Sequence, residues 1–290
     1  MRLKWLYFLL SAVVIIPGLI SLFMFGLRPG IDFIGGSLLE FRFTKEINPQ
    51  EISKSLTSKD YTVSSVQLSG EKTFLLRMPP LEKEKADQVK TLLSESFGES
   101  PEEIRFEIVG PTLGKELLIK TIVAIILAAG FILGYVAWRF KNAKFGACAI
   151  LAMFHDSLVM LGSFSLLGHF LGVEVDTLFV TAMLTVLSFS VHDTVVVYDR
   201  IRESQKLYPN VAFEQLVNKA VTETLSRSLN NSLTIIFMLI ALVLLGGVTI
   251  KWFVVALLIG TVSGTYSSTF NAAPLLVVWE NLSKRRKSKK

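Results

Sequence analysis

Ionisable side chains lie inside long apolar stretches of this sequence, where a charge is expensive to bury. His155 and Asp156 lie near the middle of one stretch, and His192 and Asp193 lie near the end of the next. Arg227 lies five residues into a third stretch. A charge at the centre of a membrane span costs roughly 2.5–3.5 kcal/mol, so such residues usually have a function, often in a proton pathway. Because carboxylate and imidazole groups can bind and release protons, these five residues form the candidate site.

Asp193 and Arg227 are predicted to lie at the same depth. Asp193 comes about five residues before its stretch ends, and Arg227 about five residues after the next begins, roughly 7 Å in each case. One loop joins the two helices, so they are antiparallel and we expect the side chains to face each other. A low dielectric favours a neutral carboxyl group and a guanidinium favours a charged one, so such a pair can relay protons. A static ion pair, or an arginine that reaches the headgroups, would be structural only.

The composition indicates that these residues belong to a membrane protein. Hydrophobic residues make up 51% of the chain and charged residues 19%, whereas soluble domains carry about 25% charged residues. Fully soluble, disordered and disulfide-scaffold classes are therefore excluded. A helix needs about 20 residues to cross a bilayer, and six segments are long enough. The first is too long for a signal peptide, so we expect a retained helix. The segments are residues 5–27, 117–138, 145–167, 175–198, 222–245 and 252–278.

Lysine and arginine residues in the short connections lie almost entirely on one side of these segments. Sixteen fall on the side of the N-terminus, and only Lys251 falls in the two short loops on the opposite side. Basic residues mark cytoplasmic loops, so both termini are predicted to lie in the cytoplasm. The net charge of +6 is then a topology signal rather than a nucleic-acid surface, and the basic tail at 284–290 could contact anionic lipids.

The polar segment between the first two spans is predicted to form a small extracytoplasmic domain. Strand patterns occur at residues 37–43, 62–68, 73–78 and 104–109, and helix patterns at 49–57 and 81–97. This β-α-β-β-α-β order predicts a split βαβ, ferredoxin-like α+β domain. It has no histidine or cysteine, so a binding or force-transmitting role is expected. The predicted divisions are helix 1 at 1–27, this domain at 28–115, a bundle of helices 2–6 at 116–283 with a cytoplasmic loop at 199–221, and the tail at 284–290.

Small residues recur on one face of the last span at steps of about four residues, and serines and an asparagine continue that face. Small residues at this spacing let helices pack closely without lipid between them. We therefore expect close helix packing rather than a ligand site. The residues assigned to helix packing are Gly246, Gly247, Gly260 and Gly264.

A metal site is not expected. The two His–Asp pairs offer suitable ligand types, but neighbouring residues point about 100° apart on a helix. The three histidines lack a recognised metal-binding spacing, and the single cysteine, Cys148, cannot build a thiolate site. We therefore expect no metal, no cofactor and no enzyme activity.

Several segments resemble the SecD/SecF family of protein translocase subunits, which is of the resistance–nodulation–division type. The run SVHDTVVVYDRIRE at 190–203 is similar to SecF sequences, as are TLSRSLN at 224–230, LLGG at 244–247 and the earlier His–Asp pair. The likeness covers nearly the whole chain, although His192 stands where the family commonly has Asn or Thr. The run GIDFIGG at 30–36 is similar to the family's G-x-D-x-x-G-G motif, which falls on Gly30, Asp32, Gly35 and Gly36.

The resemblance implies a proton-coupled subunit of protein export in the bacterial cytoplasmic membrane. A separate SecD chain would act with it in trans, beside the SecYEG channel and the SecA motor, and together they would use the proton motive force in late steps of polypeptide translocation. The family's proton-pathway residues fall on Asp193 and Arg227, and we add His192, Asp156 and His155 as candidates. The expected partners are SecD, SecYEG, SecA, the translocating polypeptide, protons and membrane lipids.

Three other functions fit parts of the sequence. A proton-coupled exporter of small molecules or lipids from the same superfamily would usually carry a larger outer domain. An intramembrane metal-dependent hydrolase would need converging ligands and an open coordination position. A passive scaffold for the export channel would contain the same spans and would differ only in moving no protons.

Overall fold

The computed structural model of the chain describes residues 1, 3–140 and 142–288 and falls into two compact units. The helical unit contains Met1–Leu27, Ala124–Val173 and Leu178–Lys290. The sheet unit contains Arg28–Val123 and Glu174–Thr177, so it includes a short piece of chain that is distant in the sequence. Four basic residues of the charge pattern lie outside the described residues: Arg2, Lys141, Lys289 and Lys290.

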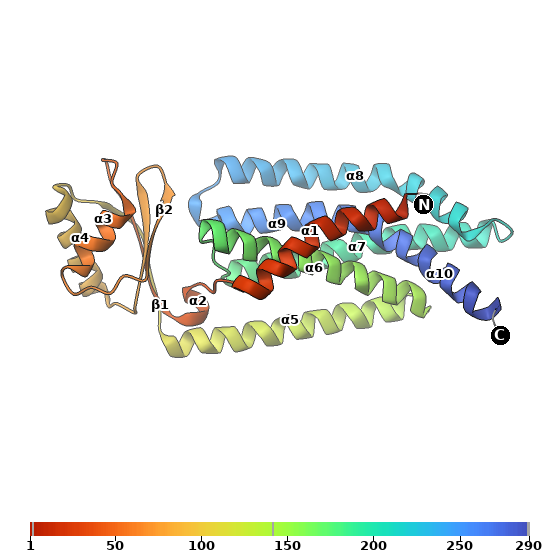
Figure 1. Cartoon of the computed structure of the whole chain (residues 1–290), viewed down its shortest axis with the longest axis horizontal. Helices are drawn as coiled ribbons and strands as arrows, with labels where there is room; N and C mark the ends of the chain where they lie inside the picture. Colours follow the sequence, from red (N-terminus) through yellow and green to blue (C-terminus); the bar gives the residue numbers. More distant parts are fainter. Residues whose placement is uncertain (2, 141, 289–290) are drawn as a thin grey trace. The chain divides into compact units, whose positions relative to one another are not determined.

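Long apolar helices build the helical unit (Figure 1). Six spans among the described residues are long and apolar enough to cross a membrane, the number predicted from the sequence. The last span combines α9, a π-helical turn and α10. Some helices extend past their apolar segments because polar residues at helix ends can lie in water. The elements are α1 (Lys4–Phe25), α5 (Pro111–Arg139), α6 (Ala143–Leu171), α7 (Thr177–Leu207), α8 (Phe213–Leu245), α9 (Val248–Ser267), η1 (Ser268–Ala272) and α10 (Ala273–Ser288).

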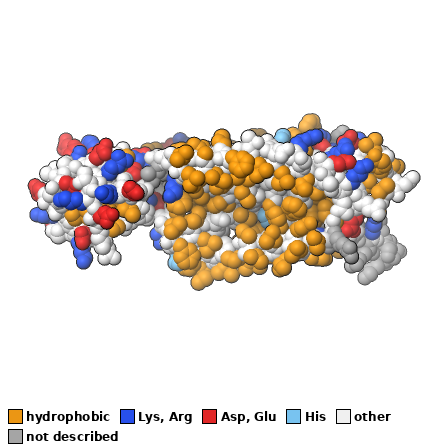
Figure 2. All heavy atoms as spheres, turned by 90° about the horizontal axis from the view of Figure 1, so that it is seen from above, with side chains coloured by type: hydrophobic (Ala, Val, Ile, Leu, Met, Phe, Trp, Pro, Cys, Tyr) orange, Lys and Arg blue, Asp and Glu red, His pale blue; other side chains and the backbone are white. Residues whose placement is uncertain are grey.

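Large hydrophobic side chains are exposed along the outer helices of this unit. Phe23 on α1, Phe131 on α5 and Phe237 on α8 are examples. Figure 2 shows hydrophobic side chains over much of the visible face of the helices, with charged side chains gathered at one end of them. An apolar surface of this extent is unusual for a soluble protein and matches the hydrocarbon core of a bilayer.

Two pairs of helices in this unit approach closely at glycines. A Cβ atom added to Gly162 of α6 would lie 2.7 Å from the Cα atom of Gly18 of α1, so the two backbones touch there. A Cβ atom added to Gly260 of α9 would lie 2.2 Å from Val186 of α7. Small residues allow such approaches, which let short polar side chains reach from one helix to the next.

A four-stranded antiparallel sheet forms the sheet unit, with strand order β2 (Ser65–Gly70), β3 (Thr73–Met78), β1 (Gly36–Arg42) and β4 (Glu102–Val109). Helices α3 (Pro49–Thr57) and α4 (Lys83–Phe97) cover one face of the sheet (Figure 1). The shared core includes Leu39 and Phe74 from the sheet and Leu56 and Leu93 from the helices, all nearly fully buried. The predicted strands and helices are all present, with ends shifted by at most three residues.

Candidate functional site

Asp193 lies on α7 and is only 7% exposed. Ser228 of α8 donates to this carboxylate, with its Oγ 2.8 Å from Oδ1 and 2.7 Å from Oδ2, and Ser268 of η1 donates to Oδ2. Among the described residues no lysine, arginine or histidine forms an ion pair with Asp193. A hydroxyl group can donate to a carboxylate and can also accept from a carboxylic acid. The site therefore offers partners to both protonation states of Asp193.

Arg227 does not pair with Asp193, contrary to the prediction. It is exposed on α8, and its neighbour Ser228 takes the position next to the carboxylate. The predicted depth is right, because Ser228 meets Asp193 at the same level. The predicted direction is wrong, because residues 227 and 228 point about 100° apart and the sequence does not define how a helix is rotated about its axis.

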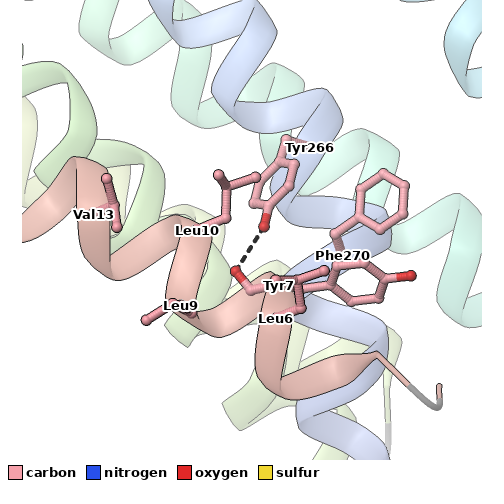
Figure 3. A pocket seen from close by; sticks show the side chains of 7 residues that line it. All are labelled: Leu6, Tyr7, Leu9, Leu10, Val13, Tyr266 and Phe270. Atoms are coloured by element: carbon pink, nitrogen blue, oxygen red, sulfur yellow. Dashed lines mark hydrogen bonds between the residues drawn. The ribbon is translucent and has the colours of Figure 1, made fainter.

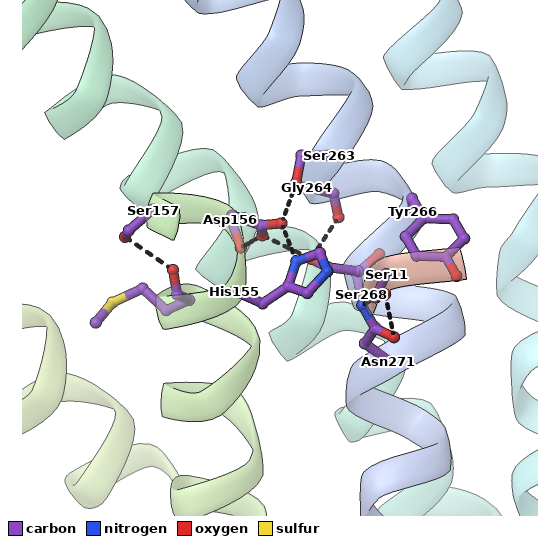
Figure 4. A network of polar contacts seen from close by, with 12 residues as sticks. Ser11, His155, Asp156, Ser157, Ser263, Gly264, Tyr266, Ser268 and Asn271 are labelled. Atoms are coloured by element: carbon purple, nitrogen blue, oxygen red, sulfur yellow. Dashed lines mark hydrogen bonds and ion pairs between the residues drawn. The ribbon is translucent and has the colours of Figure 1, made fainter. Parts of the chain in front are cut away.

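Asp156 lies on α6, is fully buried, and forms a second polar centre (Figure 4). Ser190 of α7 and Ser267 of α9 donate to Oδ2 at 2.5 Å and 2.6 Å, and Ser263 of α9 donates to Oδ1 at 2.5 Å. Nδ1 of His155 lies 3.0 Å from Oδ1. A buried charge is tolerated only when it is paired and hydrogen-bonded, and four polar groups from three helices meet that requirement here.

His155 precedes Asp156 in the sequence and contacts its carboxylate, and further polar side chains lie near His155. The Nε2 atom of His155 is buried and has no hydrogen-bond partner among the described residues. The ring of Tyr266 lies 6.4 Å from the imidazole ring. Ser11 of α1 and Asn271 of η1 form a separate buried pair, with Nδ2 of Asn271 2.9 Å from the Ser11 hydroxyl (Figure 4). Polar contacts thus link α1, α6, α7, α9 and η1 inside the bundle.

His192 is turned away from these buried centres. It is exposed on α7, and it lines two shallow cavities, one of about 660 Å³ with Thr185 and Ser188 and one of about 370 Å³ with Phe131 and Tyr135 of α5. Thr185, Ser188 and His192 therefore form a polar face of α7 on the surface of the unit. Asp193, the next residue, points inward because consecutive helical residues diverge.

The four glycines assigned to helix packing lie in two different environments. Gly260 touches Val186, and a Cβ atom added to Gly264 would lie 3.4 Å from the Cβ of Ser190, so both lie against α7. Gly246 and Gly247 end α8 and begin α9, and a Cβ atom added to Gly247 would meet nothing within 4 Å. These two residues connect the two helices, and a Cβ atom added to Gly246 would lie 2.2 Å from the carbonyl oxygen of Leu242 in α8.

The G-x-D-x-x-G-G motif lies in the sheet unit, around a short helix α2 (Ile31–Ile34) that the sequence did not indicate. Oδ2 of Asp32 accepts hydrogen bonds from the backbone N–H of Thr177 at 3.0 Å and from its hydroxyl at 2.6 Å, which caps the start of α7. Gly35 has φ +77°, and a Cβ atom there would lie 2.9 Å from Pro111. The backbone N–H of Gly30 donates to the carbonyl of Val175 at 2.8 Å.

A partly buried ion pair lies in this part of the sheet unit. Nε of Arg77 on β3 lies 2.5 Å from Oε1 of Glu174, and both side chains are less than one fifth exposed. Burial raises the pKa of Glu174 to about 6 against the opposing effect of Arg77, and burial lowers the pKa of Arg77. The sequence did not indicate this pair, because its two residues are almost one hundred positions apart.

An apolar hollow of about 350 Å³ lies between α1 and the α9–η1 segment (Figure 3). Its lining consists of hydrocarbon and aromatic side chains, and the Tyr266 hydroxyl donates to the carbonyl of Tyr7 at 2.7 Å at its edge.

The part of the chain that the structure describes has no group of three or more His, Cys, Asp or Glu side chains placed to hold a metal ion.

The sequence did not indicate that serines would hold the two carboxylates. Ser267 and Ser268 were assigned to packing, and Ser190 and Ser263 were not singled out. A signal was present for Ser190, which precedes Asp193 by three residues and therefore lies near it on the same helix. Ser263 and Ser267 also differ by one helical turn, but nothing in the sequence shows which neighbouring helix they face.

Comparison with known proteins shows extensive similarity. The family model described as "Protein export membrane protein SecD/SecF, C-terminal" matches residues 88–282, and the one described as "SecD/SecF GG Motif" matches residues 20–47. The chain is 47% identical to protein translocase subunit SecF of Thermobaculum terrenum, over 97% of this chain and 93% of that protein. It is 41% identical to SecF of Anaerolinea thermophila, over 96% of this chain and 92% of that protein.

Larger relatives contain a region similar to this chain. Protein translocase subunit SecDF of Thermus thermophilus is 34% identical over 91% of this chain, which corresponds to 36% of that protein. The crystal structure of SecDF, described as a translocon-associated membrane protein from Thermus, superposes with a TM-score of 0.86 at 31% identity, covering 97% of this chain and 39% of that chain. With a family model matched over two thirds of its length and full-length relatives above 40% identity, this chain belongs to the SecD/SecF family of protein export membrane proteins.

Proposed function

We propose that this chain is the SecF-like subunit of the Sec protein-export machinery and that it uses the proton motive force together with SecD. Its similar relatives are named SecF or SecDF protein translocase subunits, which supports a role in protein export as a multi-pass membrane protein. Export would take place beside SecYEG and SecA in a bacterial cytoplasmic membrane, and the transported polypeptide would be the substrate. The relatives' names give no support to a small-molecule exporter or a hydrolase.

The observation that carries the proton-coupled function is the environment of Asp193. This carboxylate is buried in an apolar bundle and is held by two serine hydroxyls from two other elements. Protonation removes its charge and reverses the direction of at least one of these hydrogen bonds. The packing of α7 against α8 and η1 then has two arrangements, and the occupancy of the proton selects between them.

Arg227 has a place in this cycle although it does not contact Asp193. It neighbours Ser228, so a rotation of α8 by about 100° would replace the serine hydroxyl with the guanidinium at the carboxylate. The serine would face Asp193 in one state, and the arginine would face the charged carboxylate in the other. A potential of 100 mV supplies about 2.3 kcal/mol for each charge that crosses it, enough to bias such an equilibrium about fifty-fold.

SecD covers the polar face of α7 in this proposal. Thr185, Ser188 and His192 are exposed along one side of a membrane-spanning helix, where contact with lipid would leave the polar imidazole of His192 in an apolar environment. In the fused SecDF relative, the region similar to this chain makes up 36% of the protein. The remaining part of that protein is available to cover the polar face of α7. His192 and the centre of His155 and Asp156 remain candidate members of the proton pathway.

The sheet unit is the outer domain in this account, a split βαβ, ferredoxin-like domain between the first and second spans. The excess of basic residues in the loops on the opposite side supports this orientation, with both termini in the cytoplasm. Because α7 begins within the sheet unit, at the residue capped by Asp32, a displacement of α7 is passed directly into this domain. Engagement of the emerging polypeptide by the domain would convert the displacement into transport.

Export of a preprotein into inverted membrane vesicles tests the proposal. The vesicles contain SecYEG, SecA and SecD with either the native chain or Asp193→Asn, and export is measured with and without a proton gradient. We expect the variant to lose the stimulation by the gradient. Asp199→Asn is the matched control, since Asp199 lies on the same helix in a half-exposed ion pair with Arg139 and should leave the stimulation unchanged. Full stimulation with Asp193→Asn would overturn the proposed function.

A further inference from the structure

Two consecutive serines join the two buried carboxylates. Ser267, the last residue of α9, donates to Oδ2 of Asp156 at 2.6 Å, and Ser268, the first residue of η1, donates to Oδ2 of Asp193. Both serines are fully buried, as is Asp156. Two acidic groups on different helices are therefore held by adjacent residues of a single turn.

Helix α7 supplies a second connection between the same two groups. It carries Asp193, and one turn earlier it carries Ser190, whose hydroxyl donates to Asp156 at 2.5 Å. Ser190 is fully buried. Because a helical turn moves as a unit, a displacement of Asp193 carries Ser190 with it, and the hydrogen bonds of Asp156 change too. The polar centres on α6 and α7 are thus linked through both α7 and the α9–η1 turn.

Each of the two consecutive serines has an alternative acceptor within reach. The Ser267 hydroxyl lies 3.3 Å from the carbonyl oxygen of Gly264, and the Ser268 hydroxyl lies 3.1 Å from the carbonyl oxygen of Thr265. A serine in a helix can donate to the carbonyl three or four residues earlier instead of to another side chain. Either hydroxyl can therefore stop donating to its aspartate and donate to a backbone carbonyl oxygen instead.

A π-helical turn begins at the second of these serines and spans Ser268–Ala272. Such turns are rare and occur often at functional sites, because the extra residue interrupts the regular ladder of backbone hydrogen bonds. The interruption lies directly after Ser267, so side chains on its two sides can change direction relative to each other with little cost to the rest of the span.

We propose that Asp156 and Asp193 bind protons as a coupled pair, connected through Ser267 and Ser268. When a proton binds Asp193, its new O–H donates to the Ser268 oxygen, and the Ser268 hydrogen turns to the carbonyl of Thr265. The turn then shifts, and Ser267 withdraws its hydrogen bond from Asp156 and donates to Gly264. This weakens the support for the Asp156 carboxylate and lets it take up the next proton. The inference rests on the proposed function in that Asp193 binds and releases protons.

Few other titratable or charged groups face the pair. His155 contacts Asp156 directly on α6, and Tyr266 of α9 lies beside that imidazole. On α7, His192 is exposed and Tyr198 donates to the carbonyl of Ala272 in η1. On α8, Arg227 adjoins the serine that holds Asp193 but is itself exposed. The direct connection between the two carboxylates therefore consists of hydroxyl groups.

Infrared difference spectroscopy tests the coupling, because it detects the C=O stretch of a protonated carboxyl group. The full chain is purified with SecD, placed in lipid vesicles and titrated with acid. Asp156→Asn and Asp193→Asn assign the two bands. We expect Asp156→Asn to shift the pH at which the Asp193 band appears. We expect this shift to become smaller when Asp156→Asn is combined with Ser267→Ala and Ser268→Ala, because only the connection through Ser190 of α7 then remains.

Ser263→Ala with Ser228→Ala is the matched control. It also removes one hydroxyl donor from each carboxylate, but from serines that are not adjacent. The control should alter both bands and retain the shift. A shift of undiminished size without Ser267 and Ser268, or no shift when Asp156→Asn is made with all the serines in place, overturns the inference and leaves the proposed function intact. If Asp193 gives no acid band at any pH, both the inference and the proposed function fail.

Discussion

At the scale of single residues, the hydroxyl groups around Asp193 allow a carboxylate to be buried in this bundle because they donate hydrogen bonds to it. Ser228 reaches both carboxylate oxygens, and its removal leaves Ser268 as the donor among the described residues. We expect Ser228→Ala to lower the free energy of unfolding by about 1–3 kcal/mol, since a buried acceptor loses a partner. Unfolding in detergent solution measures this change.

Ser226→Ala is the control for this substitution. Ser226 lies on the same helix two residues earlier and is exposed, so its removal should change the stability by less than about 0.5 kcal/mol. Equal effects of the two substitutions would show that the hydrogen bonds to Asp193 contribute nothing to the fold.

Glu174 should make the stability of the sheet unit depend on pH. Its pKa is about 6 in the fold against an ordinary value of 4.5, so the folded chain binds the proton more tightly than the unfolded chain does. The stability that Glu174 contributes is therefore fully present below pH 4.5 and is lost as the pH rises through 6, by about 2 kcal/mol in total. Glu174→Gln should abolish this dependence.

Hydrogen exchange of the backbone amides of β3, corrected for intrinsic rates, measures the effect in the full chain between pH 4.5 and pH 7. Parallel pH profiles for the native chain and Glu174→Gln would contradict the prediction. The experiment also reports on the Arg77–Glu174 pair, which should form as Glu174 ionises.

The sequence identified the acids of the site but not their partners. A charged residue in an apolar run stands out by its cost, so Asp156 and Asp193 could be found without a structure. Their serine partners are ordinary residues on helices whose rotation the sequence does not define. For the same reason the depth of Arg227 was predicted correctly and its direction was not.

Close contact between glycines positions whole helices. The backbones of α1 and α6 touch where Gly18 meets Gly162, and a Cβ atom on either residue would lie within 2.9 Å of the other's Cα atom. We expect Gly162→Ala to separate the helices and to lower the stability by about 1–3 kcal/mol. Thermal unfolding in detergent measures the loss. Gly134→Ala on α5 is the control, since its Cβ atom would meet nothing within 4 Å and alanine favours a helix. Equal stability of the two variants would contradict the packing argument.

Some elements could be predicted to the residue and others not at all. Helix α3 begins as expected because Asn48 caps it and Pro49 occupies the first position, both recognisable signals. Helix α2 was missed because four residues are too few for a periodic pattern. The π-helical turn was also missed, because nothing in its sequence, Ser-Thr-Phe-Asn-Ala, separates a π-helical turn from the α-helix on either side.

At the scale of the whole molecule, the number of spans could be predicted from hydropathy, because crossing a bilayer requires long uninterrupted apolar segments. The orientation of the termini stays a prediction from the distribution of basic residues. The polar face of α7 is exposed in this chain alone, and the fused relatives contain much more protein than this region. The functional unit is therefore expected to include SecD, and measurements of proton movement should be made on the pair.

Proton flux through the reconstituted pair tests most directly whether Asp193 couples hydrogen ions to export. The chain and SecD are placed together in sealed vesicles, a pH gradient is imposed, and the rate of internal pH change is followed. The native pair should conduct protons, and Asp193→Asn should reduce the flux to that of empty vesicles, with Asp199→Asn unchanged. Flux at the native rate through Asp193→Asn, or none through the native pair under these conditions, would contradict the account.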